Sequence, residues 1–146
     1  MATYRKTVAR TRAGVRRIYW TPADSLPRHL MLSVICGIPM ATYVSDYTEV
    51  PFAGKASYTR ESLHINSARA EKSTLEFRTD YILPEDIRIA LIVELMTGMC
   101  VLIGTREPNH PVVEYKDTSG DPSGEAAVRT YTVTHTDIRS GLPVMI

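Results

Sequence analysis

Apolar and polar positions alternate along most of this chain in short runs that end at glycine or proline. A period of two is typical of β-strands, whose successive side chains point to opposite faces of a sheet. The runs 57–66 and 71–82 are predicted to pair as a hairpin through the loop 67–70, with Leu75 and Phe77 on one face of the second strand. The other predicted strands are 14–20, 29–38, 41–50, 112–118 and 129–137, with one short helical turn within 22–30.

The densest apolar material lies in residues 83–107. Pro84 followed by two acidic residues fits a helix start, so a helix over 84–96 competes with a pair of strands. The β-branched residues between positions 87 and 93 favour strands, with a turn at Thr97-Gly98 and Gly104 marking the end of the second strand or a bulge. We expect this hairpin to be central, and the predicted core residues are Ile89, Leu91, Val93, Leu102 and Tyr131.

Many short strands, turns rich in glycine and proline, and the lack of a strongly amphipathic helix together predict the fold class. The chain is expected to be mainly β, an antiparallel β-sandwich or barrel with at most one short helix and a basic N-terminal arm. Its 146 residues suffice to bury one core. We assign residues 1–13 to the arm and residues 14–146 to a single β domain.

The stretch RTYTVTHTD places threonine at every second position, at Thr130, Thr132, Thr134 and Thr136. This spacing puts one uncharged hydroxyl face along a strand, and the opposite face carries tyrosine, valine and histidine between charged ends. Neither face resembles a plain apolar core face. Threonine also favours strands for its own sake. The alternative is that one face points inward and the other contacts a neighbouring chain.

The net charge of +1 conceals an asymmetry between the start of the chain and the remainder. Residues 1–28 hold seven basic residues and one acidic residue, whereas the remainder holds ten basic and fifteen acidic residues. A basic arm on a mildly acidic body favours attraction between copies or to another anionic partner such as DNA. A solvated tail is the alternative. The basic residues that begin the chain are Arg5, Lys6, Arg10, Arg12, Arg16 and Arg17.

The sequence offers little for metal or redox chemistry. Cys36 and Cys100 each lie among apolar residues, which favours free buried thiols, and the four histidines match no metal-ligand spacing. Asp117, Asp121 and Glu125 are spaced four apart in a loop rich in glycine and serine, but the ligand pattern of a calcium loop is missing. We therefore predict no metal and no cofactor.

Catalysis and membrane binding are also disfavoured. Ser62 lies near His64, and Cys100 could pair with a histidine, but no motif orders a nucleophile and a base. Phosphate-binding and dinucleotide-binding glycine motifs are missing. The longest apolar runs are far short of the roughly 20 residues that span a bilayer. We predict a protein that is not an enzyme, takes no small-molecule substrate and does not bind membranes.

The segment LIGTREPNHPVV…DTSGDPSGEAAVRTYTVTHT, residues 102–136, resembles small proteins encoded by tailed bacteriophages and prophages of gut bacteria. Those proteins share a basic start, an IYW-type first strand, a central TLEF-type strand and a closing hairpin with a Gly/Asp loop. The resemblance implies a structural role in the virion, most directly in the tail as a tube, completion or connector subunit that stacks in rings. It implies assembly in the host cytoplasm with copies of itself and other virion proteins, and brings no catalytic residues.

The expected contacts between subunits are the basic arm, the threonine face and the loop after residue 118. The candidate interface residues are Arg5, Lys6, Arg10, Arg12, Arg16, Arg17, Asp117, Asp121, Thr130, Thr132, Thr134 and Thr136. The alternative function is a ligand- or carbohydrate-binding β-sandwich module, in which Trp20, Tyr43 and Tyr47 would serve as aromatic platforms.

Overall fold

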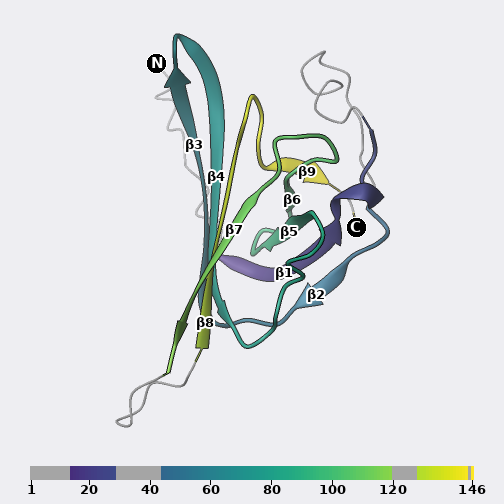
Figure 1. The fold of residues 1–146 in the computed structure, drawn as a ribbon, viewed down its shortest axis with the longest axis vertical. Coiled ribbons are helices and arrows are strands. Elements are labelled where there is room, and N and C mark those ends of the chain that lie inside the picture. The colour runs from purple at the N-terminus through teal and green to yellow at the C-terminus, as the bar shows by residue number, and fades with distance from the viewer. Residues whose placement is uncertain (1–13, 29–43, 120–127, 145) are drawn as a thin grey trace, which may run out of the picture.

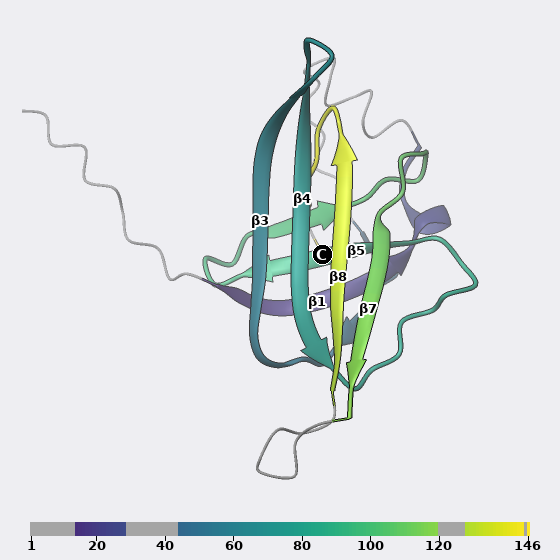
Figure 2. The same ribbon diagram turned by 60° about the vertical axis from the view of Figure 1, so that its left-hand side comes forward.

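Two antiparallel sheets pack face to face in the computed structural model, which describes residues 14–28, 44–119, 128–144 and 146 (Figure 1). The five-stranded sheet has the order β2-β1-β5-β6-β9, and the four-stranded sheet has the order β3-β4-β8-β7. Strands of one sheet run across those of the other (Figure 2). The expectation of a mainly β, antiparallel sandwich is confirmed. The strands are β1 (Val15–Pro22), β2 (Thr48–Val50), β3 (Ala53–Ile65), β4 (Ala68–Thr79), β5 (Ile89–Leu95), β6 (Cys100–Ile103), β7 (Val112–Thr118), β8 (Val128–Asp137) and β9 (Leu142–Val144).

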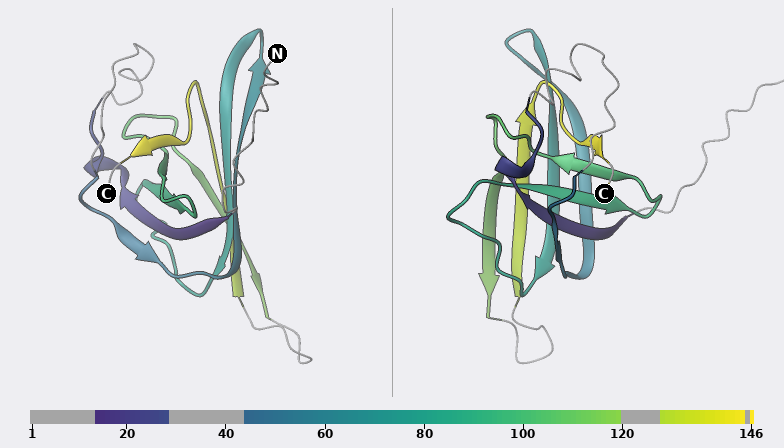
Figure 3. Two further views of the ribbon diagram at one scale, coloured as in Figure 1. Left: turned by 180° about the vertical axis from the view of Figure 1, so that it is seen from behind. Right: turned by 90° about the vertical axis from the view of Figure 1, so that its right-hand side faces the viewer.

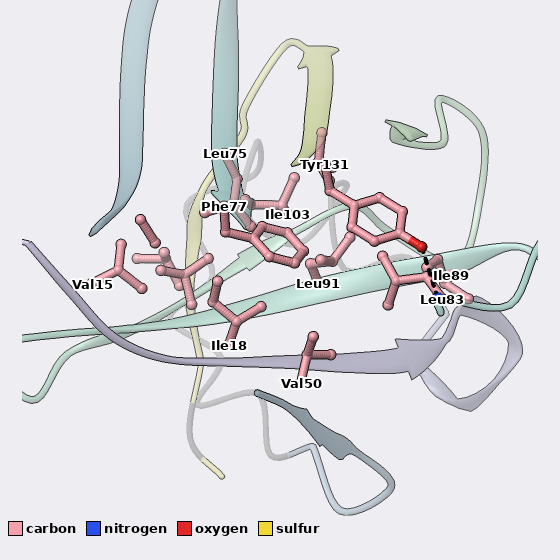
Figure 4. Close-up of a cluster of buried hydrophobic side chains, with 14 residues drawn as sticks. Val15, Ile18, Val50, Leu75, Phe77, Leu83, Ile89, Leu91, Ile103 and Tyr131 are labelled. Carbon is pink, nitrogen blue, oxygen red and sulfur yellow. Dashed lines mark hydrogen bonds between the residues drawn. The ribbon is translucent and has the colours of Figure 1, made fainter. Parts of the chain in front are cut away.

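The main core lies between the two sheets (Figure 4). Leu75, Phe77 and Tyr131 project from the four-stranded sheet toward the β1, β5 and β6 side chains of the five-stranded sheet. The rings of Phe77 and Tyr131 stack with their centroids 5.5 Å apart. All five predicted core residues are buried, with exposed fractions from 0% to 5%. The predicted facing of Leu75 and Phe77 is likewise confirmed.

Strand β5 is buried on both of its faces. Leu91 and Val93 face the main core, whereas Ala90 and Ile92 belong to a second apolar cluster on the other side of the five-stranded sheet. Burial on both sides explains why the strand is an unbroken apolar run rather than an alternating one. The described members of the second cluster are Tyr19, Leu26, Val44, Ala90, Ile92, Leu102, Leu142 and Val144.

Residues 83–107, for which a helix and a pair of strands were both considered, contain the two strands β5 and β6. This agrees with the prediction from the β-branched residues. The chain turns between β5 and β6 at residues 96–99, where Leu95 N donates to Met99 O at 2.9 Å and Gly98 adopts a φ of 89°. Gly104 ends β6 with a φ of 116°. A Cβ at this position would lie 2.8 Å from Pro111, so the close approach also requires glycine.

Several predicted boundaries are wrong. The β3–β4 loop is the two-residue turn Asn66–Ser67, not residues 67–70, because both turn residues adopt positive φ and return the chain directly into β4. Strand β1 continues through Thr21 and Pro22 by pairing with β5. The structure describes residues 44–50 of the predicted strand 41–50, and in this part Thr48–Val50 is a strand and residues 44–47 are irregular.

Other expectations are confirmed or lie outside the described residues. The short helical turn is the 3-10 helix η1, Ala23–Ser25. The predicted strand 29–38 and the loop 120–127 are outside the described residues, as is the arm 1–13.

Candidate assembly surfaces

The threonine strand β8 separates its residues cleanly between two faces. Tyr131, Val133 and His135 are buried beneath the four-stranded sheet, so this face points inward, in agreement with the alternative interpretation and with the predicted burial of Tyr131. The inward face accommodates tyrosine and histidine because their polar atoms have hydrogen-bond partners inside. The four threonines lie half-buried on the outer face. We call this outer surface of β4, β8 and β7 the threonine face.

The register of the strands places residues of the same charge on either side of Thr130 and of Thr132. Thr130 lies between Arg78 on β4 and Lys116 on β7, whereas Thr132 lies between Glu76 and Glu114. Adjacent strands are about 4.8 Å apart, so each threonine separates two like charges by two strand spacings. Like charges directly opposite each other on adjacent strands would be destabilising. Thr130 and Thr132 thus act as neutral spacers between charged residues of β4 and β7, whereas Thr134 lies between Thr74 and Val112.

A shallow hollow of about 390 Å³ lies over this arrangement. Thr130 and Thr132 contribute to its floor, and the longer charged side chains of β4 and β7 form its sides. The hollow has both charges in equal number, from Glu76, Arg78, Glu114 and Lys116.

Within the described part of the chain, the edge strands of the four-stranded sheet, β3 and β7, each pair with another strand on one side only. Only Ala56 among the thirteen residues of β3 is buried, and β7 is exposed or half-buried throughout. Long exposed edge strands present free backbone N–H and C=O groups that pair readily with another chain. Both edges are therefore candidate contact surfaces.

A cleft of about 390 Å³ with a mixed polar and apolar lining opens beside β7, between the two sheets. Its wall on the sheet side includes Val113, Tyr115 and Tyr131, and its opposite wall is formed by residues 83–89. The Tyr131 hydroxyl accepts a hydrogen bond from Leu83 N at 3.0 Å, which fixes that segment to the sheet (Figure 4). We call this hollow the β7 cleft. Its lining residues are Leu83, Pro84, Glu85, Ile87, Arg88, Ile89, His110, Pro111, Val113, Tyr115 and Tyr131.

Asp117, one of the predicted interface residues, is held by Arg129 on the neighbouring strand. The guanidinium donates from Nε to Oδ1 at 2.7 Å and from Nη2 to Oδ2 at 3.1 Å, and its carbon lies 3.9 Å from the centroid of the Tyr115 ring. The hydrogen bond from Arg129 lowers the pKa of Asp117 below its ordinary value. This bidentate pair orders the end of β7 next to the cleft.

His135 lies at the centre of a buried polar cluster on the inner face of the four-stranded sheet. Its Nδ1 is 2.7 Å from Ser140 Oγ, its Nε2 is 3.1 Å from the Asn109 carbonyl oxygen, and Ser140 Oγ is 2.7 Å from Ser73 Oγ. Burial lowers the pKa of His135, so the ring is neutral near pH 7 and its 3.8 Å approach to Asp137 is not an ion pair. Both hydroxyls are buried and hydrogen bonded, which suits a structural role in fixing the β8–β9 connection.

Two of the six predicted basic interface residues lie in the described part of the chain. Arg16 and Arg17 are exposed on β1, and Arg17 Nε lies 4.0 Å from Glu94 Oε2. The other predicted interface residues, Arg5, Lys6, Arg10, Arg12 and Asp121, are outside the described residues. Their role in assembly stays a prediction.

The aromatic platforms of the alternative function do not form a common surface in the described structure. The Trp20 side chain packs against the main core, and its indole N–H donates a hydrogen bond to the Tyr81 hydroxyl at 3.0 Å. Tyr47 contacts Tyr19 edge to face at 5.1 Å, and Tyr43 is outside the described residues.

Sequence reasoning missed the β7 cleft and the exposed apolar side chains around the sandwich. Ile82 and Ile87 beside the cleft are 69% and 46% exposed, and Met96 and Met99 in the β5–β6 turn are 44% and 55% exposed. Large apolar residues within turn sequences such as ILPEDI and LMTGM are the signal that could have identified them.

Among the described residues, no group of three or more His, Cys, Asp or Glu side chains could hold a metal ion. The same part of the chain contains no helix with the length and apolar character of a membrane span. Comparison with models of known protein families, with curated proteins and with solved structures found no match to this chain.

Proposed function

We propose that this protein is a structural subunit of a tailed-phage virion, most directly a tail component that forms rings through its β-sheet edges. The observation that supports the proposal is a four-stranded sheet whose two edges are free of partners among residues 14–28, 44–119 and 128–144. Its strands alternate in direction in the order β3-β4-β8-β7, so β3 and β7 run in opposite directions. The β3 of a second copy can therefore pair antiparallel with β7 while both copies keep the same orientation.

This head-to-tail pairing uses two different surfaces of each subunit, and such contacts close into rings when the rotation between neighbours permits. It would satisfy the exposed backbone of β3 and β7, which is otherwise an aggregation hazard for a soluble chain. The sequence resemblance to phage proteins gives the ring a context in the virion, and the basic arm and loop 120–127 supply further segments for contacts between rings.

A ring subunit is tested by determining the assembly state of the purified full-length chain. Sedimentation velocity over a wide concentration range, with negative-stain electron microscopy, is expected to reveal rings of one size or stacks of them. A chain that stays monomeric at every concentration and salt, yet binds a small ligand or saccharide, would support the binding-module alternative and overturn the proposal.

Two proline substitutions test whether the β3 edge forms the joint. Glu61 and Ser62 are adjacent, exposed residues of β3, and successive residues of a strand direct their N–H groups to opposite sides. Of Glu61→Pro and Ser62→Pro, one removes a donor from the β4 ladder and the other removes a donor from the free edge. We expect the variant that keeps the higher melting temperature to lose ring formation. Normal rings from that variant would exclude β3 as the joint.

A further inference from the structure

Two groups of exposed apolar side chains lie at opposite ends of β5. The turn that follows the strand carries Met96 and Met99, which are 44% and 55% exposed. The segment that precedes the strand carries Ile82 and Ile87, which are 69% and 46% exposed, and Ile87 lines the β7 cleft. Single exposed apolar residues are ordinary, but paired groups beside a cleft indicate contact surfaces.

The two chain segments that carry these groups extend past different edges of the four-stranded sheet (Figures 2 and 3). The β5–β6 turn extends beyond β3, and the segment between β4 and β5 extends beyond β7. The turn is held in place because Met96 N donates to Gly14 O at 3.1 Å and Leu95 N donates to Met99 O at 2.9 Å. Both groups therefore lie on the sides where neighbouring copies would meet.

The chemistry of the cleft suits methionine. Its walls include the apolar side chains of Leu83, Ile87 and Val113. Tyr115, which is 48% exposed, adds an aromatic ring with which a thioether sulfur makes favourable contacts. Methionine is unbranched and flexible, so it can fill an irregular cleft without an exact prior fit.

Charges near the two groups are complementary. Glu85 lines the cleft and is exposed, as are its sequence neighbour Asp86 and the lining cation Arg88. Arg16 and Arg17 are exposed near Gly14, whose carbonyl contacts the methionine turn, and Arg17 Nε lies 4.0 Å from Glu94 Oε2. Opposite charges on the two sides would steer copies into a head-to-tail arrangement.

We propose that the Met96–Met99 turn of one copy docks into the β7 cleft of the next copy. This inference rests on the proposed function and names a second contact at the same boundary where β3 meets β7. Because the turn and the cleft lie at opposite ends of one strand, the contact joins different surfaces of two copies and leaves a free turn and a free cleft at the ends of any open chain.

Three single substitutions of exposed apolar residues test the contact. Met99→Asp places a charge on the turn, Ile87→Asp places one in the cleft, and Ile138→Asp changes a control residue that is 56% exposed in the β8–β9 connection. By sedimentation velocity, we expect the turn and cleft variants to lose assembly and the control to assemble like the unchanged protein. Circular dichroism and thermal melting establish that all three remain folded.

Mixing the two defective variants gives the sharper result. The turn variant keeps an intact cleft and the cleft variant keeps an intact turn, so an equimolar mixture should form one-to-one dimers that cannot grow. A mixture that stays monomeric while the control assembles would overturn the docking of this turn into this cleft.

The outcomes separate this inference from the proposed function. Rings from Met99→Asp and Ile87→Asp that match those of the unchanged protein would overturn the docking contact and leave the ring proposal in place. An unchanged protein that is monomeric under all conditions would overturn both.

Discussion

The imidazole Nδ1 of His135 lies 2.7 Å from the Oγ of Ser140, and each of these residues is only 1% exposed. The ring cannot gain a proton without a charge being placed inside the sandwich. Burial accordingly lowers its pKa below the ordinary 6.5, although Asp137 partly opposes this shift.

This environment predicts acid sensitivity. Well above pH 6.5 His135 is neutral in both the folded and the unfolded chain, so it adds no pH dependence there. Below pH 6.5 the unfolded chain takes up a proton that the folded chain does not, and the free energy of unfolding falls until the lowered pKa is reached. We expect chemical denaturation to show lower stability at pH 5.5 than at pH 7.5. His135→Gln removes the titrating group, so the free energy of unfolding of this variant should depend less on pH. An equal pH dependence in both proteins would mean that other groups cause it.

A charge introduced at Thr132 should change the stability in the opposite direction from the same charge introduced at Thr130. Thr132→Glu adds a third negative charge between Glu76 and Glu114, whereas Thr132→Lys places a positive charge between them. With each cross-strand pair worth about 0.2–1 kcal/mol, we expect the lysine variant to be the more stable in urea unfolding.

Thr130 provides the matched control, because it lies between Arg78 and Lys116. The order should invert there, with Thr130→Glu more stable than Thr130→Lys. Added salt should reduce both differences. The same preference at both positions would mean that strand propensity, and not the neighbouring charges, determines the effect.

The core should depend strongly on Leu91, which is fully buried in β5. Leu91→Ala is expected to lower the free energy of unfolding by about 2–5 kcal/mol, because it removes buried methyl groups and leaves a cavity. Val112→Ala, at a β7 position that is 56% exposed, should have a much smaller effect. Urea unfolding measures both, and a loss below about 1 kcal/mol for Leu91→Ala would be incompatible with its central position.

Deleting residues 2–13 should leave the melting temperature nearly unchanged while weakening assembly. The deleted segment carries no acidic residue, and we expect it to contact an acidic surface of a neighbouring subunit. Added salt should weaken assembly of the intact protein in the same direction. Light scattering and DNA-binding measurements distinguish the alternatives, since normal assembly with lost DNA affinity would make the arm a nucleic-acid contact.

The fold class and the central hairpin could be predicted from sequence because local chemistry determines them. β-branched residues on both sides of Thr97-Gly98 indicate β5 and β6 without knowledge of distant contacts. The Asn66–Ser67 turn was missed because the expected glycine is replaced by serine, yet both residues still adopt positive φ.

The candidate surfaces depend on relationships that a single strand does not contain. Thr132 becomes a spacer only because register places Glu76 and Glu114 on either side of it. The β7 cleft combines residues from three separate segments of the chain. The burial of Tyr131 in the core could be predicted from the sequence. The hydrogen bond from Leu83 N to its hydroxyl, which shapes the cleft, could not.

The burial of β5 on both faces has a mechanical consequence for any assembly joined through its two ends. Seven residues in an extended strand span about 23 Å, and close packing on both sides leaves the strand little freedom to bend. In such an assembly the strand would rigidly connect the two contact surfaces of each subunit. Its length, rather than the slack of a loop, would then set the repeat distance from one copy to the next.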